Sequence, residues 1–453
     1  MKRSLFIASI ALLMFNGQCS MVNAQEIYSL DQILDSARHN NITLRNAQRS
    51  VDAATQQRKE AFTKYFPTVS ASGFGFTANK GMAKMDVNLS DYITPEMAAG
   101  IAQSGILPAE ALASLGQPMS MEMMKKGVMG NVMAMQPVFA GGQIINGNKL
   151  AKVGEDVSRL QLQLSENEVE KTAEQYYWQI VSLEEKLKTV NAVETLLKDI
   201  NKDVTIAVKA GVALRNDLLQ VELRQNDVES QKLTLNNNIS ILRMILAQYC
   251  GLQSTDFTLD YNPEAQSPMM EKQDHQQALI NTPEYKLLDK QVQATNLQHK
   301  MAIGSQLPTV AVGAGLVYHN MLESGRSFGM LMATVSIPIS DWWGGSHVIK
   351  RKKIEHQKAI DQLADSSELL KINMQSAWNN VQEAYQQLGI AERSIEQATE
   401  NLRLNRNFYQ AGTSTMSDLL EAQLLYQQAL DKRTDAYTNY QNRLLAYRHA
   451  VGE

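Results

Sequence analysis

Two short glycine motifs have the spelling of known chemical sites. Residues 73–78, GFGFTA, match the glycine pattern that holds the pyrophosphate of a dinucleotide, and residues 325–329, GRSFG, match the GxSxG turn that presents a nucleophilic serine. Both chemistries need a strand before the motif and a helix after it. The first motif lies inside a run that predicts a strand, and no helix follows. The second joins two predicted strands, so we expect a surface loop there and no nucleophile.

Side chains that bind metals are scattered along the chain. The seven histidines form no HExxH or i,i+4 pair, and no CxxC pattern occurs. We therefore predict no catalytic residue, no metal site and no cofactor. Ten of the 22 methionines lie between Met82 and Met135. Thioethers bind soft ions such as Cu(I), but a flexible hydrophobic filler in a loop is the simpler interpretation of this cluster.

The overall composition excludes several classes of protein. The chain has 453 residues, of which 44% are hydrophobic and 20% charged, and this balance is typical of an ordered protein. Its 43 basic and 47 acidic residues give a formal net charge of −4, which argues against binding to nucleic acid. Only 10 prolines occur, and this scarcity indicates long uninterrupted helices.

The first 24 residues have the pattern of a secretory signal. Lys2 and Arg3 precede a short, largely apolar run from Leu5 to Phe15, and the small residues at 22–24 suit a cleavage site. No other stretch has the roughly 18 consecutive apolar residues that a membrane-spanning helix requires. We therefore predict an exported protein without a transmembrane helix.

Cysteine usage fits export of the mature chain. Cys19 leaves with the signal unless it is lipidated, and Gln18 is not the small residue that a lipoprotein cleavage site favours before its cysteine. The sequence leaves that question open. Cys250 is then the single cysteine of the mature chain, so an internal disulfide is excluded.

The mature chain matches itself. Residues 40–69 align with residues 281–310, and the region around Gly211 aligns with the region around Gly412. A repeat of this length indicates a duplicated domain. We predict a signal peptide at 1–24, a first repeat at 25–266 with an insertion at about 77–128, and a second repeat at 267–453.

Each repeat predicts a helix, two strands and a long helical hairpin. The opening helices are expected at 29–65 and 283–305, with each followed by proline. The expected strands are 69–77, 128–136, 310–318 and 330–337, near the length of a tilted membrane strand. Pro137 and Pro338 should end the second strand of each pair. Glycine pairs at 141–142 and 344–345 should then open the long helices.

The helical hairpins predict coiled coils. The first long helix, 142–210, has no proline and would be roughly 100 Å long at 1.5 Å per residue. Apolar residues recur every seven positions on each returning helix, which favours a left-handed supercoil. These residues are Val221, Val228, Leu235, Leu242 and Tyr249 in the first repeat, and Leu430, Tyr437, Leu444 and Val451 in the second. End to end, opening and returning helices would match the long helix in length.

Four strands per chain cannot close a membrane barrel. Bacterial spanning barrels have at least eight strands, and an open sheet leaves unpaired backbone groups at its edges. Two chains would supply eight strands and three would supply twelve. Only the larger number leaves a wide lumen.

Three features occur together in this order: the duplication, proline-bounded strand pairs followed by Gly-Gly, and a turn motif. The motif is Tyr409-Gln410-Ala411-Gly412-Thr413 running into Asp418-Leu419-Leu420-Glu421-Ala422-Gln423. In this combination the mature chain resembles the TolC-type outer-membrane efflux proteins. The resemblance implies a mixed α and β membrane protein, with four strands and long antiparallel coiled-coil helices per chain. Three chains would form a twelve-stranded β-barrel and a periplasmic α-helical barrel.

The resemblance also implies a function and partners. The homotrimer would lie in the lipid of the outer membrane of a Gram-negative bacterium and extend into the periplasm. It would be the exit duct of a tripartite efflux or type I secretion system, joined to a periplasmic adaptor (membrane fusion) protein and an inner-membrane pump. It would conduct substrates passively, with no catalysis and no nucleic acid. The exported cargo and the identity of the pump are not readable from the chain.

The resemblance places a gate at the two turns between long helices. It implies a ring of acids at Asp418 and Glu421. Candidate latch residues are Tyr409, Arg215, Asn216 and Asp217, and candidate adaptor contacts are Gly211, Val212, Gly412 and Thr413.

The latch residues are those that would hold neighbouring turns together and keep the channel closed. They depart from the family pattern at one position. Ser414 stands where a basic residue would be expected, and Arg215 lies in the other turn. We therefore expect Arg215 to pair with Asp418 or Glu421 across a subunit boundary.

A simpler interpretation applies to the same residues. Acids in the first turns of a helix complement its dipole, and this role suffices for Asp418, Glu421 and Asp217. Gly211 and Gly412 suit the left-handed residue that ends a helix. Two other functions stay open: a periplasmic coiled-coil adaptor or surface adhesin, whose strands never enter a membrane, and an uptake porin, which would need many more strands.

Overall fold

The computed structural model describes residues 26–88, 92–105, 108, 119–262, 270–322 and 324–453. The predicted signal at 1–24, with Cys19, lies outside the described residues. The chain divides into two compact units, each containing parts of both predicted repeats. Unit 1 comprises Met1–Ala53, Glu155–Gln291 and Ile360–Glu453, and unit 2 comprises Ala54–Gly154 and Val292–Ala359.

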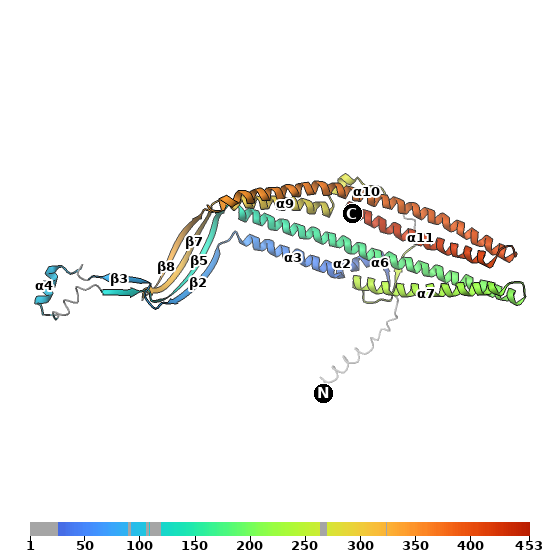
Figure 1. Ribbon diagram of the computed structural model, residues 1–453, viewed down its shortest axis with the longest axis horizontal. Helices are drawn as coiled ribbons and strands as arrows, with labels where there is room; N and C mark the ends of the chain where they lie inside the picture. The colour runs from blue at the N-terminus through green and yellow to red at the C-terminus, as the bar shows by residue number, and fades with distance from the viewer. Residues whose placement is uncertain (1–25, 89–91, 106–107, 109–118, 263–269, 323) are drawn as a thin grey trace, which may run out of the picture. The chain divides into compact units, whose positions relative to one another are not determined.

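Unit 2 contains a four-stranded antiparallel sheet (Figure 1). Its strands are β2 (Thr68–Thr77), β5 (Lys126–Ala140), β7 (Thr309–Leu322) and β8 (Ser324–Ser336), paired in the order β2-β5-β7-β8. All four expected strands are present, and each is longer than predicted. The outer strands, β2 and β8, each pair on one side only.

The register sorts the side chains of this sheet onto two different faces, because paired residues share a face and neighbours along a strand alternate. We call one the aliphatic face. It carries Val69, Ala71, Val128, Val132, Ala134, Val312, Ala314, Leu316, Leu331, Ala333 and Val335. We call the other the methionine face. It carries Met129, Met133, Met135, Met330 and Met332 together with Ser70, Ser72, Phe74, Phe76, Asn131, Val317, His319 and Phe328.

Two strand predictions are corrected by the structure. Pro137 was expected to end its strand, but β5 continues to Ala140 because the register shifts between Pro137 and Phe139. Proline lacks a backbone N–H and is tolerated where a bulge interrupts the ladder. The GxSxG residues 325–329 were expected to form a loop, but they belong to β8. Pro338 follows the end of β8 as predicted, whereas the second long helix already begins at Asp341.

The insertion in the first repeat forms a second hairpin within unit 2. Strands β3 (Ala83–Val87) and β4 (Met119–Met123) pair antiparallel, and helix α4 (Pro95–Gln103) lies between them in sequence. Thr94 caps α4 by accepting a hydrogen bond from the backbone N–H of Met97. The insertion therefore has regular structure of its own, which its methionine content did not predict.

Long helices run between the two turns and the sheet segments. The predicted long helices are α6 (Gln143–Lys209) and α10 (Asp341–Gln410), and both run through both units. The returning helices are α7 (Arg215–Cys250) and α11 (Met416–Val451). Val221, Val228, Tyr437, Leu444 and Val451 are buried, as the seven-residue repeat predicts.

The first opening helix is broken. It was expected as one element, but α2 (Leu30–Asn40) and α3 (Ile42–Thr63) are separated at Asn41, whose backbone is extended. The Asn41 amide donates to the Tyr249 carbonyl at 3.1 Å, and the Asn40 amide donates to the Cys250 carbonyl at 3.1 Å. The start of α3 thus meets the end of α7, as end-to-end stacking requires.

The second repeat has a matching break. Helices α8 (His275–Leu279) and α9 (Pro283–Gly304) are separated near Thr282, which is buried. The position of a Cβ on Gly452 would lie 3.5 Å from the Thr282 backbone. The end of α11 therefore abuts this break, as α7 abuts Asn41.

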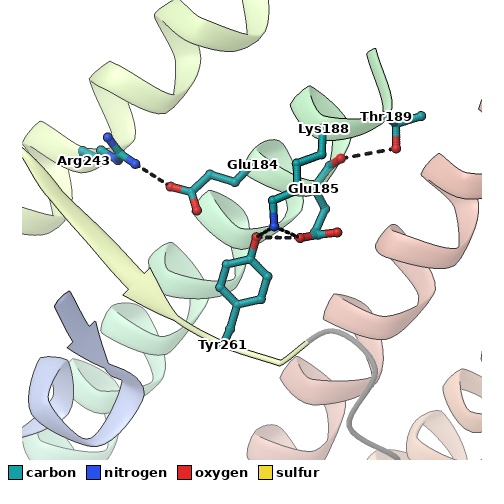
Figure 2. Close-up of polar contacts among 6 residues, drawn as sticks. All are labelled: Glu184, Glu185, Lys188, Thr189, Arg243 and Tyr261. Carbon is teal, nitrogen blue, oxygen red and sulfur yellow. Dashed lines mark hydrogen bonds and ion pairs between the residues drawn. The ribbon is translucent and has the colours of Figure 1, made fainter. Parts of the chain in front are cut away.

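A small parallel sheet in unit 1 was not predicted. Strand β1 (Glu26–Ser29) pairs with β6 (Phe257–Asp260). Figure 2 shows how the segment after β6 is held: Tyr261 Oη donates to Glu185 at 2.6 Å and accepts from Lys188 Nζ at 3.1 Å. These contacts fix the chain against α6.

An ion pair joins α7 to α6 in the same region (Figure 2). Arg243 Nη2 donates to Glu184 at 2.7 Å. The guanidinium also lies over the ring of Phe257, 5.9 Å from its centroid.

None of the helices in the described residues has the length and apolar character that a membrane-spanning helix needs.

Candidate functional site

The two turns between long helices have the same backbone structure. Gly211 and Gly412 have φ angles of +73° and +71°. In each turn the glycine N–H donates three residues back and the next N–H donates five residues back, as with Val212 to the Ala207 carbonyl at 3.0 Å. This is the Schellman motif, which satisfies the last carbonyls of a helix. Both glycines therefore end helices as predicted.

The turn into α11 is tied by a reciprocal hydrogen-bond cap. Thr415 Oγ1 accepts from the backbone N–H of Asp418 at 3.2 Å. The Asp418 carboxylate accepts from the Thr415 backbone N–H at 2.9 Å, from Thr415 Oγ1 at 2.7 Å and from Ser414 Oγ at 3.0 Å. These hydrogen bonds, from Thr415 first, lower the pKa of the Asp418 carboxyl. Asp418 and Ser414 therefore have a local role in capping α11.

The turn into α7 has a weaker cap. Leu214 occupies the cap position, and its side chain has no oxygen to accept a hydrogen bond. The Asp217 carboxylate accepts from the Leu214 backbone N–H at 3.2 Å. Burial, with the nearby charge of Asp217, raises the pKa of Tyr409. Tyr409 and Asp217, two predicted latch residues, therefore lie near each other in one protomer.

An apolar cluster lies directly behind the turns. Met416 and Leu419 of α11 pack with Val221 of α7 and with buried residues of α6 between Val190 and Val204. Tyr409 packs against the same cluster. The two turns of one protomer are therefore joined through their helices.

A polar ladder links α7 to α11 beside that cluster. Ser417 Oγ donates to Gln220 at 3.2 Å. Farther along, Arg224 donates to Gln423 at 3.1 Å and to Gln427 at 2.8 Å. Gln427 in turn donates to Gln231 at 3.0 Å.

The ladder is buried enough to matter for stability. Gln423 has no exposed surface, and its Nε2 has no hydrogen-bond partner within the part of the chain that the structure describes. Burial also lowers the pKa of Arg224. The sequence analysis missed these residues. The i,i+4 spacing of Gln220 with Arg224 and of Gln423 with Gln427 was the available signal.

An ion pair and a buried aspartate lie farther along α11. Lys186 Nζ of α6 pairs with Asp435 at 2.6 Å, and Asp431 lines a cavity of about 280 Å³ beside Lys186. Asp431 Oδ1 is buried and has no hydrogen-bond partner in the described ranges. Burial raises the pKa of Asp431 to about 6. The positive charge of Lys186 opposes this rise in the pKa, and the negative charge of Asp435 adds to it.

The remaining predicted residues lie on the surface of the protomer. Arg215, Asn216 and Glu421 are exposed, as are Val212 and Thr413. Among the described residues of one protomer, Arg215 forms no ion pair with Asp418 or Glu421. Its pairing across a subunit boundary stays a prediction. No cluster of three His, Cys, Asp or Glu side chains suited to a metal occurs within the described ranges.

Comparison with known proteins places this architecture in a family. Residues 275–453 match the model of the outer membrane efflux proteins. This part of the chain, which makes up most of the predicted second repeat, is therefore similar to that family. The matched family is one of outer membrane proteins, in agreement with the location predicted from the sequence. No curated protein sequence matches the chain.

Solved structures share the fold over nearly the whole chain. The outer membrane protein VceC from Vibrio cholerae is 14% identical, with a TM-score of 0.72, over 93% of this chain and 96% of VceC. The CmeC outer membrane channel of Campylobacter jejuni is 14% identical, with a TM-score of 0.74, over 93% and 85% of the two chains. The open-state MtrE outer membrane channel of Neisseria gonorrhoeae is 15% identical, with a TM-score of 0.73, over 93% and 88%. The fold of a TolC-type channel protomer is thereby confirmed.

Proposed function

We propose that three copies of this chain form a passive exit duct. The aliphatic face of the sheet carries the proposal: its side chains are largely exposed in one protomer, with Leu331 at 87%, Leu316 at 67% and Val335 at 63%. Such a surface suits contact with lipid. An open sheet with bare edges does not survive in lipid, so β2 and β8 must find partners. Twelve strands from three chains close the sheet and leave a lumen.

The duct is one part of a larger export machine. It receives substrates from a periplasmic adaptor and an inner-membrane pump, in a tripartite efflux or type I secretion system, and releases them outside the cell. The two turns extend into the periplasm, where Gly211, Val212, Gly412 and Thr413 contact the adaptor. Val212 supports this contact because 80% of its surface is exposed. The pump supplies the energy, and the duct catalyses no reaction.

The same turns close the duct at rest. Asp418 and Glu421 of three protomers surround the entrance, and Arg215, Asn216, Asp217 and Tyr409 hold neighbouring turns together. Because the Asp418 carboxylate is engaged in its own cap, exposed Glu421 is the freer charge of the ring. An acidic entrance favours cations and is blocked by multivalent ones.

The lipid-facing assignment is tested by placing one charge on either face of β8. Leu331→Arg puts a cation on the aliphatic face, where arginine costs about 2–4 kcal/mol at the bilayer midplane. Met330→Arg, the matched control, puts it on the opposite face. We expect Leu331→Arg to abolish the heat-modifiable, detergent-extracted trimer and its conductance in planar bilayers, and Met330→Arg to retain both. A wild-type protein that is soluble without detergent would support the coiled-coil adaptor or adhesin and overturn the duct.

A further inference from the structure

Methionine is confined to one face of the four-stranded sheet. Five methionines share the methionine face by register, and the aliphatic face has none. Met321 of β7 belongs with them, because its Cγ lies 3.0 Å from the side-chain position of Gly127, on the same face. If these methionines served only to fill space, they would be expected on both faces of the sheet. On the aliphatic face, valine, leucine and alanine fill the space instead. The segregation therefore calls for a property of the thioether itself.

Two thioether side chains converge above a glycine of the central strand. Gly313 of β7 is paired with Met135 on one side and Met332 on the other. The side-chain position that Gly313 leaves empty lies 2.3 Å from Met135 Sδ and 3.2 Å from Met332 Cγ. Both methionines therefore fold into the same notch. Any larger residue at Gly313 would displace them.

The next row repeats the arrangement. Gly315 is paired with Met133 and Met330, and Met133 Sδ lies 2.1 Å from its empty side-chain position. Since rows two residues apart lie about 7 Å apart along a strand, the four methionines form one cluster. Gly313 and Gly315 thus each receive one methionine sulfur atom, those of Met135 and Met133, and each is flanked by a second methionine on β8.

An imidazole farther along the same face has an unused nitrogen. His319 is paired with Met129, and its Nδ1 is buried without a hydrogen-bond partner among the described residues. Buried ring nitrogens ordinarily find a partner. Thioether and imidazole groups are both ligands for soft transition-metal ions.

We propose that the Met-Gly-Met rows, formed by Met133, Met135, Met330 and Met332, bind a soft monovalent cation of the Ag(I) or Cu(I) class. Neutral thioethers bind such ions by polarizability and do not hold hard cations such as Mg²⁺ or Ca²⁺. The position of this site in the lumen rests on the proposed function, because it assumes that the aliphatic face meets lipid. The sulfur cluster itself does not depend on that assignment.

The test measures Ag(I) retained by the purified full chain in chloride-free detergent solution. The site variant replaces Met133, Met135, Met330 and Met332 by leucine, which nearly conserves volume. The matched control replaces four exposed methionines, Met82, Met85, Met97 and Met244, by leucine. We expect the dissociation constant to rise at least about tenfold in the site variant, equal to about 1.4 kcal/mol, and to stay unchanged in the control. Equal retention by wild type and site variant, or none by wild type, overturns the proposal.

Two further readouts separate this site from the duct. X-ray absorption should show sulfur around silver in the wild type, and a shell of oxygen or nitrogen alone would overturn the proposal. If the fourfold variant fails to assemble, Met330→Leu with Met332→Leu removes half of the cluster and carries the same expectation. Conductance should persist in the leucine variants. If the wild type binds silver but does not conduct, the proposed duct is wrong and the metal site stands. If it conducts but does not bind silver, the metal site is wrong and the duct stands.

Discussion

Thr415 and Asp418 cap the same helix for each other: Thr415 Oγ1 accepts from the Asp418 N–H at 3.2 Å, while the Asp418 carboxylate accepts from the Thr415 N–H at 2.9 Å. The reciprocal pair satisfies two backbone donors that a helix start leaves unpaired. In the other turn, Leu214 has no oxygen, so only half of this arrangement exists. The two proposed gate turns therefore differ in rigidity, although their glycines and backbone bonds are the same.

Removing the Asp418 charge should destabilise the turn only when the carboxyl would be ionised. Hydrogen bonds lower its folded pKa, so its stabilising contribution is fully present above the unfolded value of about 4 and is lost as pH falls through the folded value. We expect Asp418→Asn to lower the unfolding temperature of the trimer at pH 7 and to match wild type at the acid end. Glu421→Gln is the control, because it removes an exposed charge and leaves the cap intact. A pH-independent difference would contradict the cap.

Arg215→Ala should make the closed channel leakier. The exposed guanidinium has no acidic partner among the described residues of its own protomer, and we expect it to meet Glu421 or Asp418 of a neighbour. Single-channel recordings should show a higher open fraction for the variant. Arg403→Ala is the control, because Arg403 pairs at 2.7 Å with Glu400 of its own helix. Unchanged conductance in Arg215→Ala would remove the charged latch.

Arg224→Met should loosen α7 from α11. The guanidinium donates to Gln423 and Gln427, and its loss leaves two buried amide oxygens without these donors. We expect a loss of about 1–3 kcal/mol in the free energy of unfolding, measured by denaturant titration. Lys209→Met, at an exposed position on α6, should change stability little. Equal effects of the two substitutions would show that the ladder contributes nothing.

Asp431→Asn should stabilise the protein above pH 6. Burial raises the folded pKa of Asp431 to about 6, so the folded state binds more protons than the unfolded state between about 4 and 6. Stability therefore falls as pH rises through this window and stays low above it. We expect the variant to gain about 1 kcal/mol at pH 8, allowing for partial screening by water, and nothing at pH 4.

The control for this substitution is Asp435→Asn. That residue is paired with Lys186 at 2.6 Å, so its loss should not stabilise the protein at any pH. A variant of Asp431 with the pH profile of wild type would mean that its carboxyl is not the titrating group.

The sequence by itself determined the two long helices with their returning helices, the four long strands and the two glycine turns. These features follow from local rules: the seven-residue repeat that buries Val221 and Val228, and the left-handed conformation that Gly211 and Gly412 adopt without strain. The hairpin in the predicted insertion was not foreseen, although β3 (AKMDV) and β4 (MSMEM) both alternate apolar and polar residues as a strand does. Residues 325–329 were assigned to a loop because they lie between two predicted strands, but β8 begins already at Ser324 and includes them.

Only the tertiary structure decided which distant residues meet. The parallel pairing of β1 with β6, the break at Asn41 and the Arg224 ladder all join segments that are remote in sequence. The alternation of side chains along β5 can be read from the sequence. The sequence does not show that Gly313 and Gly315 lie between methionines of two other strands. Periodicity tells which residues of one element share a face, whereas register between elements depends on side-chain packing across the whole sheet. That register turned scattered methionines into one surface.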